Sequence, residues 1–261
     1  MHETLQVIAV PAFEDNYIWL LHNANQAIVV DPGDETPVLN TLKTLGLTLR
    51  AILITHRHSD HIDGVAGLLN HFPNAKVFAP HFPFTFAYTP VNEGSQVSVA
   101  WDKNPAPLTF HVMGVPGHTL DHIAYVLNLP EETWLFCGDT LFGTGCGRLF
   151  EGTPTQMLAS LKKLCKLPVA TKVFCTHEYT LKNIQFARTL DPENAALMTR
   201  QSETILLRKK NLPSLPSTLQ LELATNPFLR CHTPAIKIAV HLENATELEV
   251  FSKVRALRNQ F

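Results

Sequence analysis

The sequence predicts an α/β protein with a mainly helical C-terminal part. Short apolar runs with strand character alternate with helical patterns through the first three-quarters of the 261 residues. Beyond Asp191-Pro192-Glu193 the strand signals nearly vanish. Strands interleaved with helices are typical of the α/β class, in which helices cover the faces of a sheet. A composition of 45% apolar and 17% charged residues excludes extensive disorder and provides enough apolar surface for a core.

The predicted strands are short apolar runs bounded by turn residues such as Asp31-Pro32-Gly33. In chain order they are Leu5–Val10, Tyr17–Leu21, Ala27–Val30, Leu49–Thr55, Ala75–Phe78, Gln96–Ala100, Leu108–Val115, His122–Leu127, Thr133–Phe136 and Lys172–Cys175.

The predicted helices follow from capping signals and apolar periodicity. Thr153 and Gln156 form a capping box around Pro154, which is suited to the first helical position, so this helix should run to about Leu164. The other helical patterns are Val38–Leu45, Val65–Leu69, a segment from about Tyr179, and Ala195–Arg208. We place a domain boundary at residue 180, which separates an α/β domain (1–180) from a mainly α-helical domain (181–261).

The last predicted helix starts at a second capping box, Thr246 with Glu249. Its apolar stripe consists of Leu248, Phe251, Val254 and Leu257. Arg255 and Arg258 are three residues apart, so they share a helix face offset from that stripe.

The net charge of −2 conceals an asymmetry: residues 1–199 carry −6 and residues 200–261 carry +4. A basic tail on an acidic body indicates an anionic ligand. The only basic run, Arg208-Lys209-Lys210, has no interleaved aromatic residues, so we expect no nucleic-acid partner.

No apolar stretch approaches the roughly 18 residues of a membrane span, and the N-terminus lacks the pattern of a signal peptide. We therefore expect a cytoplasmic protein without a membrane partner.

Histidine stands out, because its 13 residues outnumber the 5 Cys, 4 Met and 3 Trp together. The cysteines include no CxxC pair, which argues against a disulfide framework and against a thiolate zinc site. Any metal ligands are therefore expected to be imidazole and carboxylate groups.

Such ligands gather after the predicted strand Leu49–Thr55, in the pattern HxHxDH. His56 and His58 are two residues apart in an extended stretch, so their side chains project to the same side and can bind one cation. Asp60 and His61 follow where the chain turns toward a helix and would point to a neighbouring position. Imidazole and carboxylate ligands suit zinc, iron and manganese.

Three further ligand-type residues stand at the ends of other predicted strands. These are His118 after Pro116-Gly117, Asp139 after Cys137-Gly138, and His177 after Thr176. Loops at strand ends of α/β sheets assemble functional sites, so we expect these residues to complete the metal site. Seven ligands exceed what one tetrahedral site needs, so the count favours two metal ions.

The sequence resembles the metallo-β-lactamase-fold hydrolases and, within them, the hydroxyacylglutathione hydrolase (glyoxalase II) family. HxHxDH identifies only the superfamily, whereas His177-Glu178-Tyr179-Thr180 and Asn226-Pro227-Phe228 resemble the glyoxalase II family itself. Motifs shared with the family extend from Asp15-Asn16-Tyr17 through Gly145-Cys146-Gly147 to the helical C-terminal part. The resemblance implies a four-layer αββα sandwich carrying two divalent metal ions.

The resemblance also implies a role for each ligand. His56, His58 and His118 would bind the first metal, Asp60, His61 and His177 the second, and Asp139 would bridge them. Zinc is the expected metal, with iron and manganese as alternatives.

The implied reaction is the hydrolysis of a thioester of glutathione, S-(2-hydroxyacyl)glutathione, to glutathione and a hydroxy acid such as D-lactate. This reaction is the second step of methylglyoxal detoxification. A water molecule between two dications loses a proton at neutral pH, and the resulting hydroxide attacks the carbonyl. Asp60, also a ligand, would orient this hydroxide, and Asp139 would act with it as the second catalytic carboxylate. A thiolate leaves without a dedicated general acid, so no Ser or Cys nucleophile is required.

The family's substrate-binding positions correspond to Arg148, Phe150, Tyr179, Asn183, Arg255 and Arg258. The three arginines would bind the glycine carboxylate of glutathione through charge-assisted hydrogen bonds. Some relatives have Tyr at the position of Phe150 and Lys at those of Arg148 and Arg258. The first difference removes a hydroxyl, and the others keep the charge but alter its geometry.

Two residues outside this set are expected to support it: Asp31 as a buried turn residue behind a ligand loop, and His122 as a structural neighbour of the site. We expect a monomer.

The same fold allows other functions. Persulfide dioxygenases, which are mononuclear-iron oxidoreductases, resemble the N-terminal part but generally lack a long basic helical tail. Hydrolysis of β-lactams or phosphodiesters would leave the glutathione-type C-terminal residues unexplained, and an intact set of seven ligands argues against a non-catalytic binding module.

Overall fold

The computed structural model describes residues 5–101 and 107–261. The chain forms two compact units. Unit 1 comprises the described residues up to Gly114, together with Asp121–Pro130 and Leu135–Gly138. Unit 2 comprises Val115–Leu120, Glu131–Trp134 and Asp139–Phe261. Part of the N-terminal segment used for the signal-peptide prediction, residues 1–4, lies outside the described ranges.

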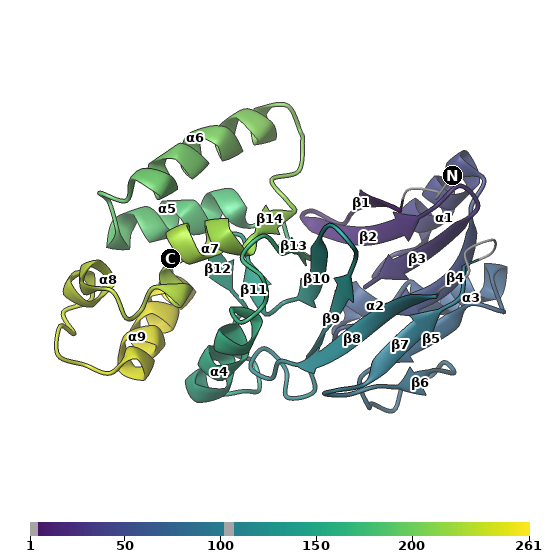
Figure 1. Cartoon of the computed structure of the whole chain (residues 1–261), viewed down its shortest axis with the longest axis horizontal. Coiled ribbons are helices and arrows are strands. Elements are labelled where there is room, and N and C mark those ends of the chain that lie inside the picture. Colours follow the sequence, from purple (N-terminus) through teal and green to yellow (C-terminus); the bar gives the residue numbers. More distant parts are fainter. Residues whose placement is uncertain (1–4, 102–106) are drawn as a thin grey trace. The chain divides into compact units, whose positions relative to one another are not determined.

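Unit 1 contains a mixed six-stranded sheet with the order β1-β2-β3-β4-β5-β6, labelled in Figure 1. Its strands are β1 (Gln6–Ala12), β2 (Asn16–His22), β3 (Gln26–Val30), β4 (Thr48–Leu53), β5 (Lys76–Ala79) and β6 (Thr89–Pro90). Strands β1 to β3 are antiparallel neighbours, whereas β3 to β6 run parallel. Parallel neighbours need crossover connections, and the crossovers from β3 to β5 contain the helices of this unit.

Helices α1 (Glu35–Leu45) and α3 (Val65–His71) pack on this sheet. Val38 and Leu42 of α1 share one buried core with Val65 and Leu68 of α3 and with alternate residues of strands β1 to β5. Helix α1 starts at its N-cap Asp34, whose side chain accepts a hydrogen bond from the backbone N–H of Thr36. The apolar residues whose spacing predicted the helices thus form the faces that the helices bury.

Unit 1 also contains the antiparallel strands β7 (Gln96–Val99), β8 (Leu108–Gly114) and β9 (Ile123–Asn128). Tyr125 of β9 is fully buried, and its hydroxyl donates to the backbone oxygens of Ile54 and Phe78, 3.0 Å from each. Strand β10 (Thr133–Gly138) starts in unit 2 and ends in unit 1.

Unit 2 holds most of the helices, drawn from teal to yellow in Figure 1. Its strands are β11 (Leu141–Phe142) and β12 (Gly145–Cys146), which pair as a hairpin, and β13 (Lys172–Cys175) and β14 (Ser217–Thr218), which pair antiparallel. Its helices are α4 (Pro154–Leu164), α5 (Thr180–Leu190), α6 (Ala195–Lys209), α7 (Leu219–Thr225), the 3₁₀ turn η1 (Pro227–Leu229), α8 (Pro234–Ala239) and α9 (Glu247–Gln260). Both predicted capping boxes are present, at Thr153 and at Thr246.

The α/β class with a helical C-terminal part is confirmed. The ten predicted strands and the predicted helices correspond to elements of the structure, with ends shifted by a few residues. The division at residue 180 stays a prediction. No helix among the described residues is long and apolar enough to cross a membrane.

Candidate metal centre and substrate site

Three imidazoles of the HxHxDH motif converge after β4. The strand ends at Leu53, and the chain then enters the short helix α2 (Ser59–Ile62). The Nε2 atom of His56 lies 3.0 Å from Nδ1 of His58, and the rings of His56 and His61 are 4.0 Å apart. His58 has an extended backbone and precedes α2, and the ring of His61 in α2 lies beside that of His56.

Asp31 supports this group from behind. Its buried carboxylate accepts hydrogen bonds from the backbone N–H and the hydroxyl of Thr55, each at 2.8 Å. Oδ2, the oxygen that accepts from the Thr55 hydroxyl, also lies 3.0 Å from Nδ1 of His61. A carboxylate on one imidazole nitrogen orients the ring and leaves the other nitrogen for a metal. Asp31 adopts a φ of +52°, so a strained backbone presents this carboxylate, in keeping with its expected role behind a ligand loop.

The carboxylate of Asp60 is oriented by Asn16, a residue for which the sequence predicted no role. The amide Nδ2 of buried Asn16 donates to Oδ2 of Asp60 at 3.0 Å and to its backbone oxygen at 3.4 Å. A Cβ at Gly33 would lie 2.0 Å from that same backbone oxygen, so only glycine permits this approach. The motif Asp15-Asn16-Tyr17 was the available signal, but no local pattern links it to a residue 44 positions away.

His122 and Arg57 lie beside the histidines of the HxHxDH motif but are not among the predicted metal ligands. The His122 ring is buried and stacks on His56, with centroids 4.6 Å apart. The Arg57 guanidinium binds the Asp121 carboxylate at 3.1 Å and lies 4.9 Å from the Phe82 ring centroid. His122 therefore packs against a ligand, as expected of a structural neighbour.

Unit 2 brings together the other three ligand candidates. Asp139 follows β10, and its two carboxylate oxygens each face a different imidazole. Oδ2 lies 3.3 Å from Nε2 of His118, and Oδ1 lies 3.3 Å from Nε2 of His177. All three side chains are buried. The bridging role of Asp139 stays a prediction.

Each of these histidines is positioned by a second contact. Nδ1 of His118 lies 2.8 Å from the backbone oxygen of Arg148, and the His177 ring stacks on Tyr179 at 4.7 Å. The hydrogen bond at Nδ1 leaves Nε2 of His118 directed at Asp139.

Three arginines form a cationic group in the same unit. Burial lowers the pKa of the Arg258 guanidinium, and the charges of Arg255 and Arg148 lower it further. Neighbouring cations repel one another, so this group favours an anion in its vicinity. Arg258 donates from Nε and Nη2 to Oδ1 of Asn183, at 3.2 and 3.0 Å.

The Arg255 side chain is buried, although its helix face is offset from the apolar stripe of α9. Its Nη1 donates to the backbone oxygen of Cys146 at 2.8 Å, and its guanidinium lies 5.0 Å from the Phe228 ring centroid. These contacts tie α9 to β12 and η1. The binding of substrate by Arg255 stays a prediction.

Phe150, one of the predicted substrate residues, is exposed, with 60% of its surface accessible. Its ring contacts His118 edge-on at 5.2 Å, and the Arg148 guanidinium lies 6.0 Å from its centroid. The apolar ring of Phe150 thus lies next to the ligand candidate His118. A tyrosine at this position would add a hydroxyl able to form a hydrogen bond.

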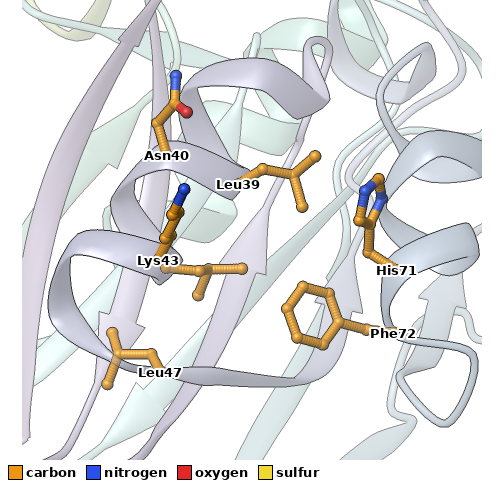
Figure 2. A pocket seen from close by; sticks show the side chains of 7 residues that line it. Leu39, Asn40, Lys43, Leu47, His71 and Phe72 are labelled. Carbon is orange, nitrogen blue, oxygen red and sulfur yellow. The ribbon is translucent and has the colours of Figure 1, made fainter.

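A separate pocket of about 330 Å³ lies in unit 1 between α1 and α3 (Figure 2). It is lined by Leu39, Asn40, Leu42, Lys43, Leu47, His71 and Phe72. None of the predicted site residues belongs to this lining.

The side chains present fit divalent metal ions. The described His and Asp groups able to bind a metal are His56, His58, Asp60 and His61 of unit 1 and His118, Asp139 and His177 of unit 2. Their donors are the imidazoles and carboxylates that suit zinc, iron and manganese. The imidazole nitrogens of His56 and His58 lie close enough to share a cation, as do Asp139 and either of its two imidazole neighbours.

Comparisons with known proteins identify the families that this chain matches. Residues 12–177 match the metallo-beta-lactamase superfamily, and residues 178–261 match the family described as hydroxyacylglutathione hydrolase C-terminus. A hydroxyacylglutathione hydrolase of Methylobacillus flagellatus is 51% identical over 98% of this chain and 99% of its own length. One of Photobacterium profundum is 47% identical over 98% of this chain and its entire length.

The chain belongs to the hydroxyacylglutathione hydrolase family. This assignment confirms the resemblance to the family and favours it over the dioxygenase alternative, because the match includes the helical C-terminal part that those relatives generally lack.

Solved structures place this family member in the metallo-β-lactamase fold, as predicted. BLEG-1 B3 metallo-beta-lactamase shares 25% identity, with a TM-score of 0.62 over 87% of this chain and 99% of its own. ETHE1 from Myxococcus xanthus, at 24% identity and a TM-score of 0.64 over 98% of both chains, shows likeness of fold alone. TTHA1623 in a di-iron-bound form shares 25% identity, with a TM-score of 0.58 over 86% of this chain and the whole of its own.

Proposed function

We propose that this chain hydrolyses the thioester of S-(2-hydroxyacyl)glutathione, with S-D-lactoylglutathione as substrate, to glutathione and D-lactate. In this role it performs the second step of methylglyoxal detoxification. One observation carries the proposal: a single chain combines the complete set of seven His and Asp ligands with a C-terminal part of the hydroxyacylglutathione hydrolase type.

The proposed cofactor is a pair of divalent metal ions, with zinc expected and iron or manganese as alternatives. His56, His58 and His118 would hold one ion, and Asp60, His61 and His177 the other, with Asp139 shared. The orientation of the two Asp139 oxygens toward different imidazoles supports this division. The di-iron form of TTHA1623 shows that a chain of this fold can carry two metals. When bound, such ions activate water at neutral pH and polarise the thioester carbonyl.

The protein's own catalytic groups orient water and substrate. Asp60, whose carboxylate accepts a hydrogen bond from the Asn16 amide, would accept a hydrogen bond from the attacking water and orient it. The departing glutathione thiolate needs no proton donor. Cys146 does not serve as a nucleophile, because burial raises the pKa of its thiol and keeps it protonated.

The substrate tripeptide would be held by the residues of unit 2. Arg148, Arg255 and Arg258 provide positive charge for the glycine carboxylate, and the Asn183 amide and the Tyr179 hydroxyl provide hydrogen bonds. Phe150 would contribute an apolar contact beside His118. In this proposal, Arg255 and Arg258 of the basic segment 200–261 bind the anionic substrate.

We also propose that the enzyme acts as a monomer in the cytoplasm. All the ligands and all the substrate residues named above come from one chain, so no second copy is needed to complete the site. The five cysteines are free thiols, which fits a reducing compartment.

The test is turnover of S-D-lactoylglutathione by the purified protein, together with its metal content. We expect hydrolysis with two metal ions per chain, and we expect His58→Ala to lose both activity and metal. His111→Ala, an exposed histidine on β8, is the matched control and should retain both. Protein that holds two metals but leaves the thioester intact would contradict the proposal.

A further inference from the structure

The β11–β12 hairpin connects the metal-ligand candidate Asp139 to the substrate residue Arg148. Phe142 pairs with Gly145, so the hairpin turns through only two residues, Gly143 and Thr144. Thr144 adopts a φ of +56°, a conformation that is strained for a β-branched residue. Such a turn persists only where its surroundings enforce it.

Glu222 of α7 is one of the residues that enforce it. Its carboxylate is fully buried, and Oε2 accepts a hydrogen bond from the backbone N–H of Thr144 at 2.8 Å. The other oxygen binds the buried guanidinium of Arg200 at 2.5 Å. A charged acceptor in a buried site makes a strong hydrogen bond, so the strained residue is held by its own N–H.

Asn226 holds the two residues on either side of the turn. Its amide Nδ2 donates to the backbone oxygens of Gly145 at 2.9 Å and Phe142 at 3.3 Å, and to Oε2 of Glu222 at 3.1 Å. Its Oδ1 accepts the backbone N–H of Phe228 in η1. Asn226 therefore joins the hairpin, α7 and η1 through one side chain.

The hairpin in turn supports the side chains proposed to bind glutathione. Nδ2 of Asn183 donates to the backbone oxygen of Gly143 at 3.0 Å, and Oδ1 of the same residue accepts from Arg258. Nη1 of Arg255 donates to the backbone oxygen of Cys146 at 2.8 Å. The turn and the second strand thus fix three substrate-binding candidates.

We propose that Glu222 and Asn226 are positioning residues for glutathione binding. They hold the Gly143-Thr144 turn in the conformation on which Asn183, Arg255 and Arg258 rest. This inference depends on the proposed function for the identity of the ligand, but its structural part concerns only the hairpin.

The first experiment compares Glu222→Gln and Asn226→Ala with the wild-type protein. We expect KM for S-D-lactoylglutathione to rise at least tenfold, with kcat changed less than threefold and two metals retained. Asn226→Ala leaves the pair of Arg200 and Glu222 intact, so it provides the result if the Glu222 variant does not fold.

Asp191→Asn is the matched control. Asp191 binds Arg230 at 2.9 Å within the same helical part, and no hydrogen bond described for it reaches the hairpin. We expect this control to lower the melting temperature while leaving KM unchanged. An unchanged KM in both hairpin variants would overturn the inference.

The second experiment tests whether strain at Thr144 is what Glu222 holds. Glycine tolerates positive φ, and Thr144 Oγ1 makes no hydrogen bond among the described residues, so Thr144→Gly should remove the strain at little other cost. Introduced into Glu222→Gln, Thr144→Gly should reverse at least a third of the increase in KM. If Glu222 served only to neutralise Arg200, the double variant would show no such rescue.

Hydrogen exchange and glutathione binding keep this inference distinct from the proposed function. We expect faster exchange of the Thr144 amide in Glu222→Gln than in wild type, and weaker binding of glutathione measured by calorimetry. Wild-type protein that fails to hydrolyse the thioester would contradict the proposed function alone. Unchanged amide exchange together with unchanged glutathione binding would contradict the positioning role.

Discussion

At the scale of single residues, the proposed metal ligands depend on neighbours outside the proposed ligand set. Asn16 holds the carboxylate of Asp60, and Asp31 faces the Nδ1 atom of His61 while binding Thr55. Partners of this kind set the direction of a ligand and its basicity, and their loss typically lowers metal affinity about 10- to 100-fold.

Asn16→Ala tests whether Asp60 needs a neighbour to orient it, and this substitution changes no charge. The Asp60 carboxylate, 36% exposed, would lose the amide donor that orients it. We expect metal affinity to fall by roughly 10- to 100-fold at the site that Asp60 serves. Titration of metal-free protein with zinc, competed by a chelator, measures the change. Asn40→Ala, an exposed asparagine of α1, is the control and should bind zinc as the wild type does. Equal affinities for Asn16→Ala and wild type would show that Asp60 needs no such support.

At the scale of elements, α9 carries two arginines with different surroundings. Arg255 is buried against Cys146 and Phe228, whereas Arg258 is half-buried and binds only one described side-chain acceptor, Oδ1 of Asn183. The same helix face thus supplies one residue that ties α9 to the hairpin and one that is more accessible to a ligand.

This difference predicts distinct effects of two alanine substitutions. Loss of a charge-assisted hydrogen bond costs about 1.5–3 kcal/mol, so Arg258→Ala should raise KM about 10- to 100-fold with little change in melting temperature. Arg255→Ala should raise KM and also lower the melting temperature, because it leaves the backbone oxygen of Cys146 without this donor. Steady-state kinetics and thermal unfolding of both variants provide the comparison. A lower melting temperature for Arg258→Ala than for Arg255→Ala would reverse the assignment.

Elements defined by local signals were predicted most closely. Helix α4 matches its prediction from the N-cap Thr153 to Leu164, because its capping box is encoded within four residues. The short elements α2, β6, β11, β12, β14, α7, η1 and α8 were not predicted, because segments of two to seven residues carry little periodic signal. Strand β4 ends at Leu53 rather than Thr55, because the Thr55 N–H binds the Asp31 side chain instead of a neighbouring strand.

The same distinction applies to the site. The HxHxDH spacing placed its histidines together without any knowledge of the fold, as the 3.0 Å contact of His56 and His58 confirms. The partners of Asp60 and of Thr144 could not be predicted in this way. They lie 44 and 78 positions away in the sequence, and neither asparagine nor glutamate at those places follows a local pattern.

At the scale of the whole molecule, the charge asymmetry acquires a physical meaning. Residues 200–261 carry a net charge of +4, yet one of their arginines, Arg200, is neutralised by Glu222 in the interior. Arg255 and Arg258 instead donate to neutral acceptors, so their charges remain available to attract an anion. Two of the positive charges in the C-terminal part therefore belong to residues proposed to bind the substrate.

The free thiols make the stability of the whole chain sensitive to alkaline pH. Burial, followed by the charges of Glu222 and Glu247, raises the pKa of Cys165 from 9.0 to about 11, and burial also raises the pKa values of Cys146 and Cys231. Above the pKa of an unfolded thiol, the unfolded chain loses protons that the folded chain retains. The free energy of unfolding therefore decreases as the pH rises, with the contribution of Cys165 fully present below pH 9 and lost between pH 9 and about 11.

Denaturant unfolding of wild type and Cys165→Ala at several pH values between 8 and 11 isolates this contribution. Because the Cys165 thiol is partly exposed, its share of the slope should stay below about 1.4 kcal/mol per pH unit. We expect the stability of wild type to decline more steeply than that of Cys165→Ala across this range, with both slopes negligible near pH 8. The buried thiols of Cys146 and Cys231 remain in the variant, so a residual decline is expected there. Parallel curves for the two proteins would show that Cys165 ionises alike in the folded and unfolded chains, and that the alkaline limit of this enzyme is set by other groups.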